Sequence, residues 1–272
     1  MAKSTSWSGR HSRKDSLRQT IWTRLHTQGI ALDHPWGRIP NFIGAEQAAF
    51  ALAQLPQWQQ AQVVKCNPDA PQTPVRRQAL QDGKCLYMAV PKLTAAHCFV
   101  ALTGEILAQK GISLDQGATK EHVLAYGTPV RFTDMDPIDL AVVGCVAVTP
   151  NGGRTGKGAG FADLEFALLQ EHGLLSVKTV IATTVHDLQI VAADHLPMQT
   201  HDWPLDWVVT PSQVIPTHTP YPRPQGLDWQ RLQPEQRQQI PALKSSQTKP
   251  FIANDPADIL RASQDKGRMK AD

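Results

Sequence analysis

Apolar side chains recur at every fourth position near the start of the chain. Leu17, Ile21 and Leu25 are spaced four residues apart, so in a helix they share one face. We expect this helix to begin at Arg13 and to end at Gly29, because glycine is common just beyond the last turn of a helix. The pattern is typical of a helix that packs one side against a core.

Further along, short apolar runs alternate with helical patterns. Strands are expected at residues 62–66, 85–90, 98–102, 140–148, 178–185 and 207–210. Helices are expected at residues 44–55, 74–81 and 161–169. The run at 140–148 is unbroken and rich in valine, which favours a strand buried on both faces of a parallel sheet. The alternation predicts an α/β fold, with a mostly parallel sheet and helices on both faces.

The two ends of the chain differ from this apolar middle. Hydrophobic residues make up 41% of the 272 residues, because polar and proline-rich ends dilute the average. Residues 1–12 are rich in basic residues and have no regularly spaced apolar positions, so they are expected to be disordered. We expect a single α/β domain over 13–215, a proline-rich extension packed on or near it over 216–243, and a disordered tail over 244–272.

Hydropathy, charge and cysteine spacing narrow the class of protein. No stretch approaches the roughly 18 apolar residues that span a bilayer, so we expect a cytoplasmic protein without a membrane partner. The net charge of +3 is too small to indicate a nucleic-acid partner. The cysteines lack the spacing of a metal site and are expected to be small core residues. They are Cys66, Cys85, Cys98 and Cys145.

A glycine-rich turn carries the clearest chemical signal. It consists of Gly156, Lys157, Gly158, Ala159 and Gly160. The turn precedes a helix that starts at Phe161, so backbone amides and the helix dipole there attract an anion. Lys157 adds a mobile positive charge, and Arg154 stands just before the turn. The spacing is not that of a P-loop, and by itself it fits either a polyphosphate site or a flexible hairpin.

The segment 153–163 resembles the signature of 5-formyltetrahydrofolate cyclo-ligases, also called 5,10-methenyltetrahydrofolate synthetases. Their loop has the form N-R-x-G-[RK]-G-x-G-[YF]-[YA]-D. Three further blocks follow the family's order: K-x-x-[LI]-R at 14–18, G-K at 83–84 and H-D-x-x-[VL]-D at 201–206. The chain is still more similar to the cyclo-ligase domain of methenyltetrahydrofolate synthetase domain-containing proteins. That similarity includes residues 38–42, 67–69, 184–187 and 222–224, and it extends over about 13–243.

The resemblance implies a fold and a reaction. The fold would be a single α/β domain of the NagB/RpiA/CoA-transferase-like kind. The protein would be a ligase of folate one-carbon metabolism that uses ATP and Mg²⁺. ATP would phosphorylate the formyl oxygen of 5-formyltetrahydrofolate, N10 would attack the activated carbon, and phosphate would leave to give 5,10-methenyltetrahydrofolate.

The resemblance also implies roles for individual residues. The ATP phosphates would be bound by Lys14, Arg18, Gly156, Lys157, Gly158, Ala159, Gly160 and Phe161. Lys157 and Arg154 would act in catalysis. Asp163 would help to hold the metal, although it is equally interpreted as a first-turn carboxylate stabilised by the helix dipole. Asp69, His186 and His201 would contact the reduced folate. Alternatively, the pair at 201–202 fixes a loop beside the site, and the pair at 186–187 is a chance neighbour among ten histidines.

Departures from the family pattern leave a second function open. Lys157 replaces the usual loop arginine, which keeps the charge but loses the bidentate fork. Phe161 and Ala162 replace two tyrosines, and Gln72 falls where the family has a threonine. The alternative is a nucleotide-binding protein of the same fold that has lost the ring closure and has a regulatory or other phosphoryl-transfer role. An RNA-associated role rests only on the basic N-terminus and on the RNA-recognition module that some members of the similar group carry. The sequence predicts no oligomeric state.

Overall fold

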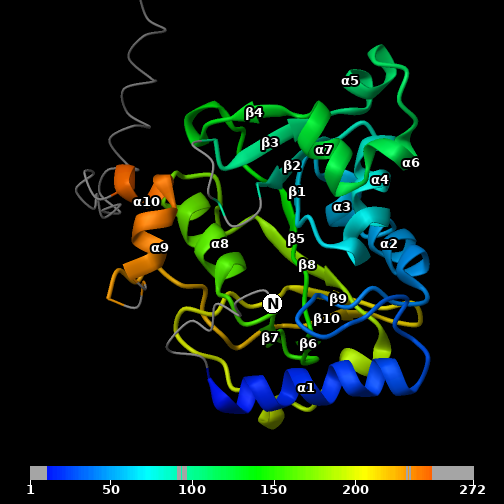
Figure 1. The fold of residues 1–272 in the computed structure, drawn as a ribbon, viewed down its shortest axis with the longest axis vertical. Helices are drawn as coiled ribbons and strands as arrows, with labels where there is room; N and C mark the ends of the chain where they lie inside the picture. Colours follow the sequence, from blue (N-terminus) through cyan, green and yellow to red (C-terminus); the bar gives the residue numbers. More distant parts are fainter. Residues whose placement is uncertain (1–10, 91–92, 94–96, 231, 233, 247–272) are drawn as a thin grey trace, which may run out of the picture.

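A computed structural model of the chain describes residues 11–90, 93, 97–230, 232 and 234–246. Parallel strands form the centre of one sheet (Figure 1): β1 (Val63–Cys66), β2 (Cys85–Ala89), β5 (Leu140–Val142), β8 (Val180–Thr184) and β9 (Trp207–Val209). Antiparallel strands form its edges: β3 (Phe99–Leu102), β4 (Thr128–Val130) and β10 (Val214–Pro216). The order across the sheet is β10-β9-β8-β5-β1-β2-β3-β4. The fold is therefore α/β with a mostly parallel sheet, as the sequence predicts.

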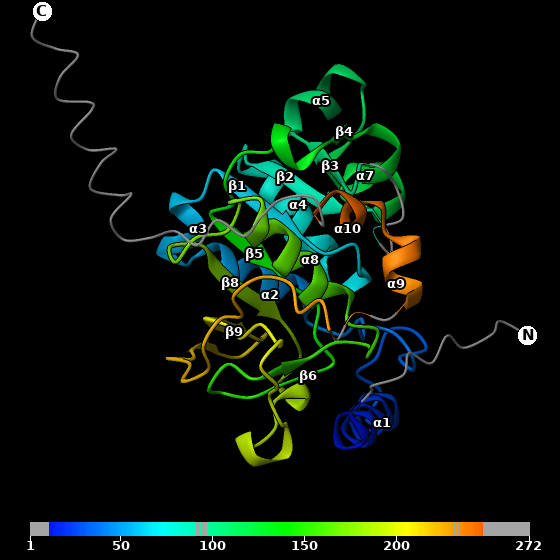
Figure 2. The same ribbon diagram turned by 90° about the vertical axis from the view of Figure 1, so that its left-hand side faces the viewer.

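Helices cover both faces of this sheet, as Figures 1 and 2 show. The first face is covered by α2 (Ala45–Ala53), α3 (Pro56–Gln60), α4 (Thr73–Gln81), α5 (Gly104–Gln109), α6 (Leu114–Gly117) and α7 (Lys120–Tyr126). The second is covered by α8 (Phe161–Glu171) and α10 (Pro241–Ser246), and α9 (Pro234–Gln239) lies next to α10. Leu140 and Val142 face the first set, whereas Ala141 and Val143 face the second. Burial on both sides explains why β5 is uniformly apolar.

The expected single strand over 140–148 is wrong. Strand β5 ends at Val142, and β6 (Ala147–Val148) pairs instead with β7 (Arg154–Thr155) in a separate two-stranded sheet. All residues from 140 to 148 are buried, so the apolar run continues across the break between the two sheets. The glycine turn consequently follows the β6–β7 hairpin and not the central strand.

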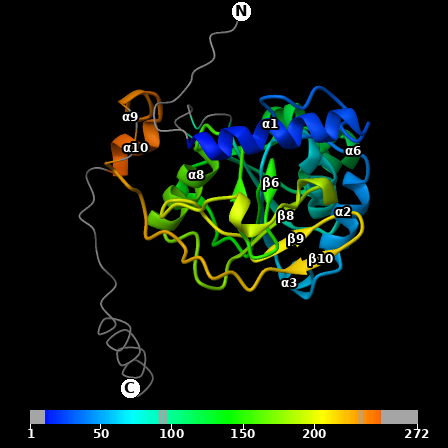
Figure 3. The same cartoon turned by 90° about the horizontal axis from the view of Figure 1, so that it is seen from below.

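Helix α1 (Ser12–Thr27) lies outside the two main layers, across the hairpin (Figures 1 and 3). Its buried face carries Ile21, Trp22 and Leu25, which pack with Val146 and Ala147. The helix therefore has the apolar face that its four-residue spacing predicts, and it begins one residue before and ends two residues before the expected bounds. Within the part of the chain that the structure describes, no helix is long and apolar enough to cross a bilayer.

The C-terminal segment departs from the expected boundaries at two points. Strand β10 joins the sheet through Pro216, so the sheet extends past the boundary expected at residue 215. Helix α10 continues to Ser246, into the segment expected to be a disordered tail. Leu227, Ile240 and Leu243 from the extension pack against the cluster under α8. The disorder expected for 1–12 and 244–272 falls mostly on 1–10 and 247–272, which lie outside the described residues.

Candidate functional site

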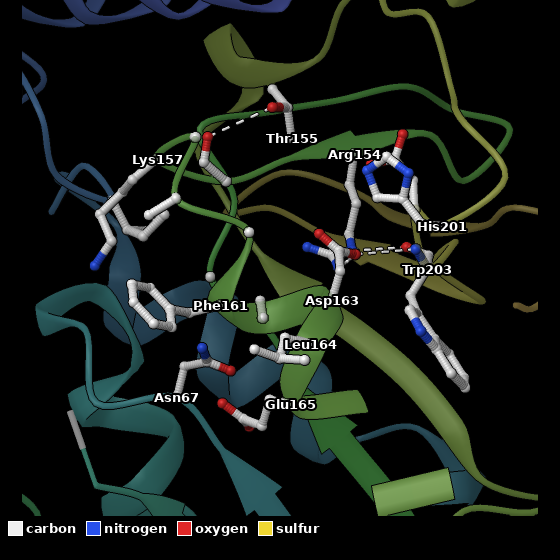
Figure 4. A pocket seen from close by; sticks show the side chains of 18 of the residues that line it. Asn67, Arg154, Thr155, Lys157, Phe161, Asp163, Leu164, Glu165, His201 and Trp203 are labelled. Carbon is white, nitrogen blue, oxygen red and sulfur yellow. Dashed lines mark hydrogen bonds and ion pairs between the residues drawn. The ribbon is translucent and has the colours of Figure 1, made fainter. Parts of the chain in front are cut away.

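A cavity of about 1050 Å³ opens where the central strands end. Asn67 and Asp69 follow β1, and Gly144 follows β5, so the sheet contributes its carboxyl edge to the wall. This is the edge at which open α/β sheets bind ligands. Helix α1, the segment from Arg154 to Glu165 and the segment 199–203 contribute further parts of the lining, as Figure 4 shows for some of its residues. The structure thus brings together the blocks that stand far apart in the sequence.

The glycine turn lies on this wall and leads into α8. Gly158 has φ +97° and Gly160 has φ +70°, a left-handed conformation that side chains with a Cβ rarely adopt. Gly160 is the N-cap of α8, an 11-residue helix, so the unpaired amides of its first turn lie at the cavity. Backbone and helix dipole together suit an anion at this point.

The cations expected to bind phosphate line the cavity, and each has an oxygen partner. Lys14 forms a buried ion pair with Asp202. Arg18 donates from Nε to the carbonyl oxygen of Gly156 over 2.6 Å, which ties α1 to the glycine turn. Lys157 Nζ lies 2.8 Å from Asp69 Oδ1 and its side chain is 43% exposed. The positive charge needed to bind a polyphosphate is therefore present in the cavity. Each of the three cations is paired with an oxygen atom of the protein.

Arg154 also lines the cavity, but its guanidinium is buried and bound to protein groups. Its side chain is 2% exposed, its Nε donates to the carbonyl oxygen of Trp203 over 2.7 Å, and its Nη2 donates to Asp163. Burial alone would lower the pKa of this guanidinium, but the neighbouring Asp163 carboxylate keeps the pKa raised. The backbone amide of Trp203 also donates to Asp163 Oδ1, over 3.0 Å. Arg154 therefore joins β7, α8 and the 201–206 segment, an arrangement that suits a residue positioning these three elements.

This network bears on the expected metal site. Asp163 Oδ1 accepts from both Arg154 and the backbone of Trp203. Within the described ranges, no three His, Cys, Asp or Glu side chains cluster as a metal site. A divalent ion here would depend mainly on oxygen ligands that a bound nucleotide brings with it.

The two histidines expected to contact the substrate lie in different places. His201 lines the cavity, 3.8 Å from Asp202. His186 is not among the lining residues; its Nδ1 accepts from the amide of Leu188 and caps the short helix η4 (Asp187–Gln189). Its ring lies 6.1 Å from that of Phe42, and burial lowers its pKa while Asp187 opposes the shift. The structure therefore does not bring His186 to this cavity, because its ring caps η4 and packs near Phe42.

A buried polar group beside the cavity was missed by the sequence analysis. Lys65, on β1, is fully buried, forms an ion pair with Glu165 of α8 and donates to Asn67 Oδ1 over 2.7 Å. Burial raises the pKa of Glu165, and Lys65 opposes that shift. The available signal was a charged residue inside the apolar run VVKC and another inside the apolar helix that follows the glycine turn.

Two solved structures that match this chain have low sequence identity to it. The NMR structure of 5,10-methenyltetrahydrofolate synthetase from Aquifex aeolicus is 19% identical, with a TM-score of 0.49, over 80% of this chain and 99% of that one. The 5,10-methenyltetrahydrofolate synthetase from Mycoplasma pneumoniae is 9% identical, with a TM-score of 0.41, over 72% of this chain and 97% of that one.

Curated relatives found by sequence have a higher sequence identity to this chain than these two solved structures do. Methenyltetrahydrofolate synthase domain-containing proteins are 38% identical in Bos taurus and 37% identical in Homo sapiens, each over 235 residues and 85% of this chain. That of Danio rerio is 35% identical over 240 residues. The matched region spans 61–62% of these relatives' own length. Residues 10–211 also match the profile of the 5-formyltetrahydrofolate cyclo-ligase family. The chain belongs to the 5-formyltetrahydrofolate cyclo-ligase family.

Proposed function

We propose that this protein is an ATP-dependent cyclo-ligase that converts 5-formyltetrahydrofolate to 5,10-methenyltetrahydrofolate. The observation that carries the proposal is one cavity that combines an anion-binding glycine turn with cations from distant segments. Lys14 and Arg18 come from α1, and Lys157 comes from the turn itself. Membership of the cyclo-ligase family supports this reaction over others that use the same phosphate-binding geometry.

The phosphates of ATP would bind to the amides of Gly156, Gly158, Ala159, Gly160 and Phe161 and to the side chains of Lys14, Arg18 and Lys157. Phosphate oxygens would compete with Asp202 for Lys14 and with Asp69 for Lys157. Charge-assisted hydrogen bonds of this kind are about twice as strong as neutral ones. Magnesium would neutralise charge on the transferring phosphoryl group, and Asp163 is the side chain that we assign to it.

In the proposed reaction, the γ-phosphoryl group moves to the formyl oxygen, which makes the formyl carbon electrophilic. N10 then attacks that carbon and inorganic phosphate leaves with the oxygen. Lys157 would stabilise charge on the transferring group, because it is the exposed cation of the turn. Asp69 and His201, which both line the cavity, would contact the folate. Arg154 would act indirectly, by holding Asp163 and the backbone of Trp203 in place.

The direct test is to mix the purified protein with 5-formyltetrahydrofolate, ATP and Mg²⁺ and to follow the absorbance of the methenyl product. The expected result is product that forms only when ATP is present. Absence of product in a preparation that still binds ATP by calorimetry would reject the proposal.

One observation favours a second candidate function. Phe161 and Ala162 lie on the cavity wall at positions where the family usually has two tyrosines, so the two phenol hydroxyls are absent from this chain. A nucleotide-binding protein that has lost the ring closure would give heat on titration with ATP and none with 5-formyltetrahydrofolate. A cyclo-ligase would give heat with both.

A further inference from the structure

A buried ion pair lies directly behind the cavity wall, away from the phosphate-binding residues. Lys65 is 0% exposed and Glu165 is 4% exposed, and the two are ion-paired between β1 and the first turns of α8. Nothing in the proposed phosphoryl transfer uses either side chain. Removing two charges from water is unfavourable, and apolar residues of similar volume often stabilise such a site better. Binding of a ligand therefore explains the presence of this ion pair better than a contribution to the stability of the fold does.

The pair is connected to the cavity by two side chains. Glu165 and Asn67 both belong to the cavity lining, and Lys65 Nζ donates to Asn67 Oδ1 over 2.7 Å. Because the amide oxygen of Asn67 is used in this way, its NH₂ group remains as the donor. Figure 4 shows the polar ends of Asn67 and Glu165 turned toward each other, with the ring of Phe161 beside them. Within the described chain, Lys65 is the cation paired with the Glu165 carboxylate, which has lone pairs left for further donors.

Together these groups form a slot with a defined pattern. Glu165 offers acceptors, the NH₂ group of Asn67 offers a donor next to them, and the ring of Phe161 offers an apolar face. A planar heterocycle that presents one acceptor beside two N–H donors matches this pattern. The 2-amino-4-oxopyrimidine ring of a pterin has that edge, with O4, N3–H and the 2-amino group in a row. Adenine offers a single donor group beside an acceptor, so it would leave the carboxylate less well satisfied.

We infer that Glu165 and Asn67, with Lys65 behind them, bind the 2-amino-4-oxopyrimidine edge of the pterin and thereby determine specificity for a folate. This inference rests on the proposed function for the identity of the substrate, but it concerns residues that phosphate binding does not use. Lys65 is a positioning residue: it holds the Asn67 amide in one orientation and fixes the Glu165 carboxyl group beside it. The acceptor side chain of the site is thus matched to a donor edge of the ligand and not to a phosphate.

The test is calorimetric titration of the full chain with four probes: free pterin, p-aminobenzoylglutamate, 5-formyltetrahydrofolate and ATP. Glu165→Gln replaces one acceptor oxygen with a donor, so the affinity for pterin and for 5-formyltetrahydrofolate should fall about tenfold or more. The affinities for p-aminobenzoylglutamate and ATP should stay within about twofold of the wild type, well inside the tenfold that one charged hydrogen bond represents. Glu105→Gln, the same change at an exposed position outside the cavity, is the matched control.

A second variant keeps the test decisive if Glu165→Gln does not fold. Lys65→Met combined with Glu165→Met removes both charges while preserving volume, and such exchanges are usually tolerated. It should lose pterin binding while its thermal unfolding remains cooperative. Unchanged pterin binding in both variants, or no pterin binding by the wild type, would overturn the inference. Loss of ATP affinity in place of pterin affinity would also overturn it, by assigning the slot to adenine.

The two proposals fail in distinguishable ways. If the wild type forms the methenyl product and Glu165→Gln has an unchanged KM for 5-formyltetrahydrofolate, the cyclo-ligase assignment stands and the pterin slot is wrong. If the wild type forms no product but binds free pterin in a manner that depends on Glu165, the slot stands and the cyclo-ligase assignment is wrong.

Discussion

Lys157 Nζ lies 2.8 Å from Asp69 Oδ1, so the glycine turn and the segment after β1 are joined across the cavity. Lys157 is the exposed cation of the proposed phosphate site, and Asp69 is a proposed contact of the folate. A phosphate and a folate would each compete for one member of this pair. Binding of either ligand would therefore release a group that serves the other.

Replacing Asp69 with Asn should raise the affinity for ATP, because Lys157 would no longer be held by a carboxylate. An exposed ion pair is worth about 0.2–1 kcal/mol, so the gain should be at most about fivefold. Lys157→Ala should lower ATP affinity by about tenfold or more, the loss expected for a hydrogen bond to a charged group. Calorimetric titration with ATP alone measures both effects.

A lower ATP affinity in Asp69→Asn would contradict the proposal that Asp69 and the ATP phosphates compete for Lys157.

Arg154→Met should unfold more easily and should not merely slow the reaction. The change leaves Asp163 without its guanidinium partner and the carbonyl of Trp203 without its donor. Breaking a buried pair in this way typically costs about 3–5 kcal/mol. Urea unfolding measures the loss, and Arg131→Met, in the exposed pair with Asp134, is the control that should change little. Wild-type stability together with a large fall in kcat would instead indicate direct catalysis by Arg154.

The fold could be predicted where the burial of an element is recorded in the sequence as regularly spaced apolar residues or as a continuous apolar run. The four-residue spacing of Leu17, Ile21 and Leu25 predicted α1, and the valine-rich run predicted β5. The break at Val142 could not be predicted, because β5 and β6 are both fully buried although they belong to different sheets. Hydrophobicity reports burial and says nothing about which neighbour supplies the hydrogen bonds.

The site could be predicted only as separate blocks. The glycine turn and the basic residues of α1 were identified as phosphate-binding segments, and the structure brings them to one cavity. Their pairing could not be predicted, because Lys14 and Asp202 are 188 positions apart. Lys65 and Glu165 were overlooked for a related reason. A charge inside an apolar run contradicts the local pattern, and its explanation depends on a partner from another element.

Gly144→Ala should weaken folate binding more than ATP binding. A Cβ at this position would lie 3.1 Å from Asp69 Oδ2, 3.1 Å from Gln72 Oε1 and 3.0 Å from Ile39 Cγ1. These contacts are too close, and Asp69 is the member of the three that lines the cavity as a charged group, so it should be pushed from its place. KM for 5-formyltetrahydrofolate should rise several-fold, by roughly 1 kcal/mol of lost binding, while ATP affinity changes less. Unchanged KM in a well-folded variant would show that Asp69 is not a contact of the substrate.

Stability should decrease as the pH falls below neutrality, partly because of His186. Burial lowers the pKa of this histidine in the folded state, whereas in the unfolded chain it titrates near about 6.5. The unfolded state therefore binds the proton first, and the stabilising contribution is lost as the pH falls from that value through the lower folded pKa. His186→Asn keeps an acceptor for the amide of Leu188 but cannot titrate. Urea unfolding between pH 7.5 and 5.0 should show a flatter pH dependence for this variant, and the same slope as the wild type would exclude His186 as its source.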